Sequence, residues 1–265
     1  MTCYLSLPHF YYNLKFNNCL VNFIHKNPES KICNFNIESF YGSFPFVSWN
    51  GDITSNFLNN RPLPMHDDYF NFLKKSSCLL RFDMTNPFLQ DYNDIHSNII
   101  LKMCEDGNNQ IEISDYELYK KIKENFPNYY FIYNNKYKEE IDFISEDILY
   151  IHDFYKKTLK SNIEITLGEK CSCNSKQKII CLLQENSNQM NFSGKSIYNK
   201  CDKLNNYNNL ELRNELNLYL SKGIKHFKID SPAFKDLNNF NKYLIKNLLK
   251  EEYEKDFWKY YNSKE

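Results

Sequence analysis

The chain has 265 residues, of which 42% are hydrophobic and 17% aromatic, and its 33 basic residues balance 33 acidic ones. This length suits a single α/β domain with a large core, and the balanced charge excludes a global field that would attract nucleic acid or an anionic membrane. The chain has 38 Asn but one Ala and three Arg, which is the bias of an AT-rich genome, so we interpret its Asn tracts as loop sequence.

Eight short segments have the pattern of β-strands. Several alternate apolar and polar residues, and residues 78–83 are apolar enough for a strand buried on both faces of a parallel sheet. The predicted strands are residues 4–8, 34–41, 78–83, 110–113, 129–133, 148–152, 162–167 and 224–229.

Helical periodicity and capping signals occupy most of the segments between these strands. At one helix start, Ser114 is the predicted N-cap and Glu117 follows three residues later, which is the capping-box pattern. The predicted helices are residues 14–24, 67–75, 91–103, 115–125, 138–144, 154–159, 210–220, 234–249 and 251–261.

The alternation of strands and helices predicts a (β/α)8 TIM-type barrel that forms a single domain over residues 1–265. The alternation breaks at about 169–209, where we expect an irregular insertion. In such a barrel the first and last strands must pair. The alternative is an open doubly wound sheet, but the chain lacks the Gly-x-Gly-x-x-Gly turn of dinucleotide-binding folds.

The sequence also bears on location and redox state. No apolar run approaches the roughly 20 residues of a membrane span, and the first residues lack the basic start and apolar stretch of a signal peptide. We therefore expect a cytoplasmic protein. Nine cysteines, an odd number, favour free thiols or a metal site over a disulfide framework.

Polar residues near the ends of the predicted strands are the candidate site residues, because barrel enzymes place their sites at the carboxyl ends of the strands. Carboxylates there can act as acids or bases, and basic, aromatic and amide groups can hold a ligand. The predicted catalytic residues are Glu38, Asp83 and Asp230, and the predicted substrate-binding residues are His9, Trp49, Arg81, Asn86, His152 and Lys228.

Structural alternatives exist for these candidates. Arg81 and Asp83 are two residues apart and so face the same side of a strand. If that side is the interior, a buried structural ion pair explains them as well as a ligand clamp does. Trp49 is equally interpretable as a packed loop residue.

Four cysteines in the predicted insertion form a candidate metal site, because thiolates suit zinc and iron-sulfur clusters. Their spacing contains no Cys-x-x-Cys pair, and cysteines also occur throughout the rest of the chain, so metal binding is one hypothesis and unligated thiols are the other. The candidate ligands are Cys171, Cys173, Cys181 and Cys201.

The segment 223–232, Gly-Ile-Lys-His-Phe-Lys-Ile-Asp-Ser-Pro, resembles the segment that ends the barrel of collagenase-like peptidases. That family also includes proteins that support tRNA and ubiquinone hydroxylation. The match covers Gly223, Phe227, Lys228 and Ile229, whereas Asp230 replaces a Glu and residues 231–232 replace Gly-Arg. Residues 41–51 and 80–86 also resemble uncharacterised bacterial barrel proteins related to the family. The resemblance implies a barrel and, in some members, a cysteine-held iron-sulfur cluster.

Two functions follow as hypotheses. The first is a peptidase-like hydrolase that acts on a peptide or another small polar ligand at the carboxyl-end mouth of the barrel. The second is a non-catalytic barrel that serves as a binding or scaffold subunit for a protein partner, because residues 231–232 depart from the family pattern. A nucleic-acid partner is disfavoured, since acidic residues intersperse the lysines of residues 242–259.

Overall fold

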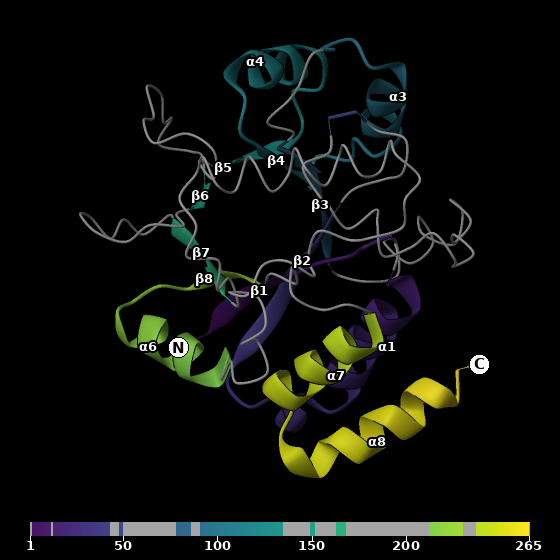
Figure 1. The fold of residues 1–265 in the computed structure, drawn as a ribbon, viewed down its shortest axis with the longest axis vertical. Coiled ribbons are helices and arrows are strands. Elements are labelled where there is room, and N and C mark those ends of the chain that lie inside the picture. The colour runs from purple at the N-terminus through teal and green to yellow at the C-terminus, as the bar shows by residue number, and fades with distance from the viewer. Residues whose placement is uncertain are drawn as a thin grey trace, which may run out of the picture.

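The protein is described by a computed structural model, which defines residues 2–11, 13–42, 48–49, 78–85, 91–134, 149–151, 163–167, 212–229 and 237–264. These residues contain eight β-strands, every neighbouring pair of which is parallel, with helices around them (Figure 1). Each strand overlaps one of the segments predicted from the sequence. The strands are β1 (Cys3–Leu7), β2 (Phe35–Gly42), β3 (Leu79–Met84), β4 (Gln110–Ile113), β5 (Tyr130–Asn134), β6 (Leu149–Ile151), β7 (Ile163–Leu167) and β8 (His226–Ile229).

Seven of the strands form one curled sheet in the order β7-β8-β1-β2-β3-β4-β5. At its centre β1 pairs with both β2 and β8, and Leu5 aligns with Phe227, so the first and last strands are neighbours as predicted. The short β6 lies between the two outer strands of the sheet. It is three residues long and aligns with β7 at only two of them, so it links the outer strands β5 and β7 weakly.

The predicted (β/α)8 TIM-type barrel is therefore wrong as a regular closed barrel. A regular barrel needs strands whose tilt and stagger are uniform around the ring, and a three-residue β6 cannot supply that pairing between β5 and β7. The described structure is a seven-stranded half-barrel sheet whose edges β6 bridges. Within the described residues, helices follow β1, β3, β4, β7 and β8, whereas the helices predicted at 67–75, 138–144 and 154–159 lie outside them.

The helices cover parts of the outer side of this sheet (Figure 1). Among those described, α1, α7 and α8 lie together on the side of β1 and β2, whereas α3 and α4 lie on the side of β3 and β4. None of the described helices is both long enough and apolar enough to cross a bilayer. The helices are α1 (Leu14–Lys26), a 3-10 turn η1 (Pro28–Ser30), α3 (Ile95–Met103), α4 (Tyr116–Asn125), α6 (Leu212–Ser221), α7 (Leu237–Leu248) and α8 (Glu251–Asn262).

Two helix starts show how carboxylates set the boundaries. Asp115, and not the predicted Ser114, is the N-cap of α4, and its carboxylate accepts a hydrogen bond of 2.9 Å from the backbone N–H of Leu118. The predicted capping box is therefore wrong by one residue. A carboxylate at this position satisfies a helix N–H and also interacts favourably with the helix dipole. Asp94 caps α3 in the same way, accepting from the N–H groups of His96 and Ser97.

Aromatic packing joins α8 to α1. Phe257 of α8 is fully buried, and its ring meets those of Phe16 and Phe23 edge to face, with centroids 5.7 and 5.4 Å apart. Such contacts add to the free energy gained by removing the rings from water. The cluster therefore fixes the last helix against the first one.

We expect Phe257→Ala to lower the free energy of unfolding by about 3–5 kcal/mol, because it removes a buried ring and leaves a cavity between α1 and α8. The exposed Lys255→Ala on the same helix is the matched control and should change stability by less than about 0.5 kcal/mol. Urea unfolding followed by circular dichroism measures both. Equal, small losses for the two variants would show that α8 is not docked through this ring.

Asp94 gives a pH-dependent prediction. Burial acts to raise the pKa of its carboxyl, but hydrogen bonds from the Ser97 hydroxyl and from the N–H groups of Ser48 and Ser97 outweigh it and hold the pKa below its usual value. A lowered folded-state pKa contributes stability above the unfolded-state pKa, and this contribution is lost as pH falls through the folded-state value. Asp94→Ala should therefore cost about 1 kcal/mol at pH 7 and almost nothing once the parent carboxyl is protonated.

The exposed carboxylate Asp256 on α8 is the control, since Asp256→Ala should change stability little at either pH. The comparison is made by urea unfolding at neutral and strongly acidic pH. An Asp94→Ala penalty that is the same at both would contradict the assignment.

Candidate functional site

Charged side chains from distant strands meet inside the curled sheet. Arg81 of β3 donates two hydrogen bonds to the Glu164 carboxylate of β7, from Nη1 to Oε2 at 2.6 Å and from Nη2 to Oε1 at 3.1 Å. Both side chains are fully buried. Three strands, β8, β1 and β2, separate β7 from β3 in the sheet, so this bidentate pair spans the interior of the curl.

Neighbouring polar groups complete this pair. Arg81 Nε donates to Gln110 Oε1 at 2.9 Å, and the Ser6 hydroxyl donates to Glu164 Oε1 at the same distance while accepting from Ser39. Burial acts to lower the pKa of Arg81, but the carboxylates of Glu164 and then Glu112 outweigh it, so the pKa rises above its ordinary value. The guanidinium therefore stays charged, and each of its three nitrogens donates a hydrogen bond to a neighbouring side chain.

A second ion pair lies one step nearer the carboxyl ends of the strands. Lys228 Nζ of β8 lies 2.5 Å from Glu112 Oε1 of β4 and 4.2 Å from the centre of the Tyr41 ring. The Tyr41 hydroxyl donates to the carbonyl oxygen of Ile229 at 2.7 Å. Glu112 Oε2 is also 3.9 Å from Arg81 Nη1, which links the two pairs. Two cations and two carboxylates thus form one connected network across four strands.

The charged residues of the network and its neighbour Asp83 differ in their exposure to solvent. Asp83 aligns with Glu112 two residues beyond Arg81, and its Oδ1 accepts a hydrogen bond of 2.5 Å from the Thr85 hydroxyl. Asp83 and Lys228 each retain 7% of their surface, whereas Arg81, Glu112 and Glu164 retain none. A ligand approaching from the carboxyl ends would therefore meet Asp83 and Lys228 first.

Glu38, one of the predicted catalytic residues, does not join Asp83. It lies 3.2 Å from Nδ1 of His226, the first residue of β8, and Tyr4 stacks on that imidazole with centroids 5.0 Å apart. The register of β1 and β2 shifts opposite Glu38, between Leu5 and Ser6, which redirects this part of β2. Glu38 thus belongs to the amino side of the interior, away from the proposed point of ligand approach.

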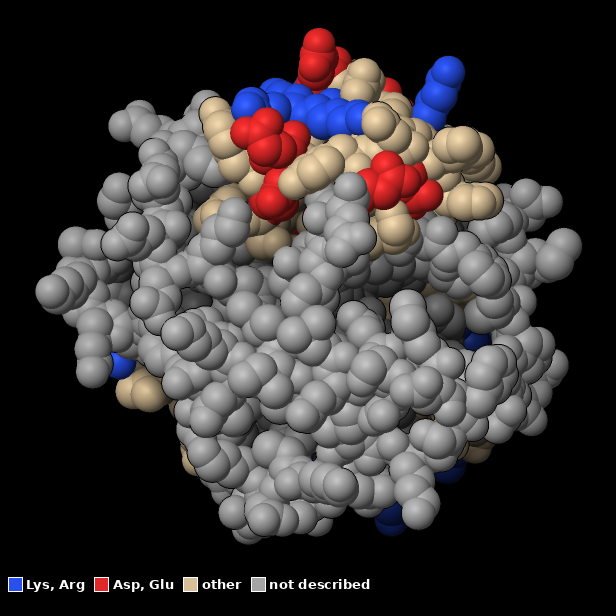
Figure 2. Space-filling view, turned by 45° about the horizontal axis from the view of Figure 1, so that its top comes forward, with Lys and Arg blue, Asp and Glu red and all other residues tan. Residues whose placement is uncertain are grey.

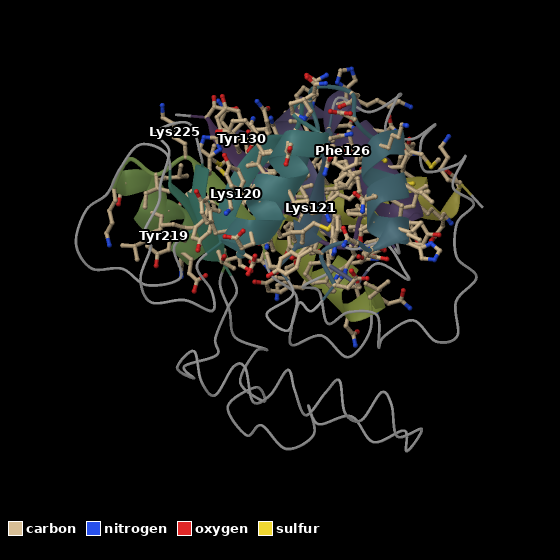
Figure 3. The ribbon with its side chains drawn as sticks, turned by 90° about the horizontal axis from the view of Figure 1, so that it is seen from above. Lys120, Lys121, Phe126, Tyr130, Tyr219 and Lys225 are labelled. Carbon is tan, nitrogen blue, oxygen red and sulfur yellow. The ribbon has the colours of Figure 1, made fainter. Side chains whose placement is uncertain are left out.

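In Figure 3, Lys225, which leads into β8, and Tyr130, which opens β5, lie near the same edge of the molecule. The described part of the face formed near α3 and α4 carries acidic and basic side chains next to one another (Figure 2). One such pair is Lys120 and Glu117, 2.7 Å apart. That part of the face therefore presents no field of a single sign.

His9 and Trp49, two predicted ligand contacts, pack against protein. His9 follows β1 with a left-handed backbone (φ 66°), is buried, and its ring meets Phe240 of α7 edge to face at 5.5 Å. Trp49 is fully buried, and its Nε1 donates to the carbonyl oxygen of Asp91 at 2.8 Å. Both rings therefore contribute to packing within the protein.

The remaining predicted site residues lie outside the described part of the chain. Within the part that is described, no group of three or more His, Cys, Asp or Glu side chains is arranged to hold a metal ion. The residues outside are Asn86, His152 and Asp230, together with the candidate metal ligands Cys171, Cys173, Cys181 and Cys201.

Sequence reasoning missed the two buried glutamates, although a signal was present. Glu112 lies between Ile111 and Ile113, and Glu164 lies between Ile163 and Ile165. A single carboxylate between β-branched residues, in a strand expected to be buried on both faces, must have a charged or hydrogen-bonded partner inside the sheet. Pairing these carboxylates with Arg81 and Lys228 would have anticipated the network.

Comparison with known proteins adds no relative. No protein-family model, no curated protein and no solved structure matches this chain. The resemblance of residues 223–232 to collagenase-like peptidases therefore stays a prediction from the sequence.

We expect Arg81→Met and Glu164→Met each to cost about 3–5 kcal/mol of unfolding free energy, because each leaves an unpaired buried charge. The double variant should lose less than the sum, since it removes both charges together. Urea unfolding of the four proteins in the cycle measures the coupling. The exposed pair Lys120 and Glu117 is the control, with a coupling below about 0.5 kcal/mol. Additive losses at Arg81 and Glu164 would contradict the interaction.

Proposed function

We propose that this chain is an enzyme that binds a peptide or another small polar ligand at the carboxyl end of the curled sheet. In this proposal Lys228 holds an anionic group of the ligand and Asp83 transfers a proton. The supporting observation is the uneven burial of the network: among the charged residues that the structure describes around Arg81, only Asp83 and Lys228 keep exposed surface at that end.

The neighbours of these two residues support the roles assigned to them. Glu112 and the Tyr41 ring fix the Lys228 ammonium before any ligand arrives, which reduces the entropic cost of binding. The Thr85 hydroxyl orients the Asp83 carboxyl. Because Glu112 is paired with Lys228 and sealed from solvent, the reachable Asp83 is the better acid or base of the two carboxyls.

Amide hydrolysis is the reaction that this arrangement would serve. Asp83 would accept a proton from a water molecule whose oxygen attacks the amide carbonyl carbon. It would then return the proton to the amine as the carbon–nitrogen bond breaks, so that the carboxylate is restored at the end of the cycle. Lys228 would attract the carboxylate of the peptide and position it for this attack.

Three further parts of the proposal rest on the sequence. They are kinship with the collagenase-like peptidases through residues 223–232, a cytoplasmic location, and a zinc or iron-sulfur group at Cys171, Cys173, Cys181 and Cys201. Thiolate side chains are suitable donors for either metal group.

A specific observation favours the second candidate, a non-catalytic binding or scaffold subunit. The two cations Arg81 and Lys228 are already matched by Glu164 and Glu112, with contacts of 2.6 and 2.5 Å. Cations that carboxylates of the protein already neutralise can serve folding alone. In that case the carboxyl end would contact a protein partner without turnover.

The two candidates differ in their response to Asp83→Asn. Random tetrapeptides are incubated with the protein, and newly formed amino groups are measured by fluorescamine. We expect the parent to release amines and Asp83→Asn to be slower by about 100-fold or more, since an amide cannot take the proton. Its urea midpoint should stay near that of the parent, because an amide oxygen can still accept from Thr85.

Asp256→Asn, on the exposed face of α8, is the matched control and should retain the parent rate. An inactive parent, or equal rates for Asp83→Asn and the parent, would overturn the hydrolase. If the inactive parent is nevertheless stabilised against heat by the same tetrapeptides, and Asp83→Asn is not, the binding function is supported instead.

A further inference from the structure

Two cysteines meet at the amino end of the sheet, away from Asp83. Cys3 opens β1, and Cys33 lies two residues before the start of β2. The backbone N–H of Cys3 donates to the carbonyl oxygen of Asn34 at 3.0 Å, and the Asn34 amide donates to the Thr2 hydroxyl at 2.8 Å. These bonds and the alignment of Cys3 with Phe35 hold the two segments side by side, so that the thiols of Cys3 and Cys33 are close enough to shift the pKa of each other.

The two thiols differ in access to solvent. Cys3 has no exposed surface, whereas Cys33 is only partly buried. Cys33 is therefore the residue of the two that a small oxidant from solution can approach. The Cys3 thiol is in place to attack the Cys33 sulfur after that sulfur has been oxidised.

Basic side chains also favour the thiolate at Cys33. Lys31 is held nearby, with Nζ donating to the Phe35 carbonyl oxygen at 2.8 Å, and Arg213 of α6 donates to Leu249 at 3.0 Å. The hydrogen bond from Cys3 lowers the pKa of Cys33 to about 7 against the opposing effect of burial, and the charges of Lys31 and Arg213 act in the same direction as that bond. The same hydrogen bond, together with burial, raises the pKa of Cys3.

Three other described cysteines have a raised thiol pKa, unlike Cys33. Burial raises the pKa of Cys78 and of Cys104 to about 12, and it also raises that of Cys19. Because the thiolate is the reactive form, these thiols should be slow to react at neutral pH.

We propose that Cys3 and Cys33 are an oxidation site at which a peroxide converts the two thiols into a reversible disulfide. The Cys33 thiolate attacks one peroxide oxygen, the oxygen–oxygen bond breaks, and the departing hydroxide takes a proton to become water. Cys33 is then a sulfenic acid. Cys3 attacks that sulfur, the sulfur–oxygen bond breaks, and the second water leaves with the Cys3 proton. The two thiols lose two electrons, and hydrogen peroxide is reduced to two waters.

The product would link the start of β1 to the entry of β2 and enclose α1 in a covalent loop. A link of this kind restricts the unfolded chain and should raise the melting temperature of the oxidised protein. A small thiol reductant would reverse it by thiol-disulfide exchange. The proposal is independent of catalysis at Asp83, because the two sites lie at opposite ends of the strands.

Peptide mapping tests the proposal on the unmodified protein. The chain is treated with hydrogen peroxide, remaining thiols are alkylated, and cleavage after lysine places Cys3 and Cys33 in separate peptides, 1–15 and 32–74, neither of which contains another cysteine. We expect these two peptides to become joined with the loss of two hydrogen atoms, and to separate after reduction. Before oxidation, iodoacetamide at pH 7 should label Cys33 at least about 10-fold faster than Cys19 or Cys78.

Cys33→Ser should abolish both the joined peptide and the fast labelling, whereas Cys19→Ser, the matched control on α1, should leave both unchanged. Circular dichroism of each variant confirms that it is folded. Peptides 1–15 and 32–74 that stay reduced, a Cys33 joined to another cysteine, or labelling of Cys33 no faster than that of Cys19 would each overturn the proposal.

Discussion

The buried ion pair between Arg81 and Glu164 is the interaction on which the described structure most depends. It joins β3 to β7 across the interior of the curl, with both side chains sealed from water. Burying two charges is costly unless they are paired and their other donors and acceptors are satisfied. Ser6 of β1 donates to Glu164, and Gln110 of β4 accepts from Arg81. The curl of the sheet is what brings these four side chains together, so the ion pair and the curl depend on each other.

This network also separates the two ends of the interior. On the carboxyl side, Lys228 and Asp83 retain a little exposed surface; on the amino side, Glu38 meets His226. Charged groups in a low-dielectric interior interact strongly over short distances. The buried Glu112 carboxylate therefore fixes the position of the Lys228 ammonium. The proposed catalytic chemistry and the proposed thiol chemistry of Cys33 thus occupy opposite ends of the same strands and can be altered separately.

Part of the fold was predictable from the sequence. The eight strand segments and the pairing of β1 with β8 were predicted. Arg81 and Lys228 pair with buried carboxylates of one network, and Asp83 aligns with one of them, Glu112; a role of these residues in binding or catalysis stays a prediction. The regular (β/α)8 barrel was wrong, because β6 is too short to pair uniformly with its neighbours. Glu38 was assigned to the wrong end, since an irregular register between two strands leaves no trace in an alternating pattern.

The sequence by itself determined which segments become strands and helices. Strand alternation, helical periodicity and capping residues act over a few neighbouring positions, so they are visible in a linear string. Only the tertiary structure decided which charges pair, because Arg81 and Glu164 are 83 residues apart and Lys228 and Glu112 are 116 apart. It likewise decided which thiols meet and which carboxylate stays reachable. Those outcomes depend on the curl of the sheet, which sets the distances across its interior and the depth at which each side chain is sealed from water.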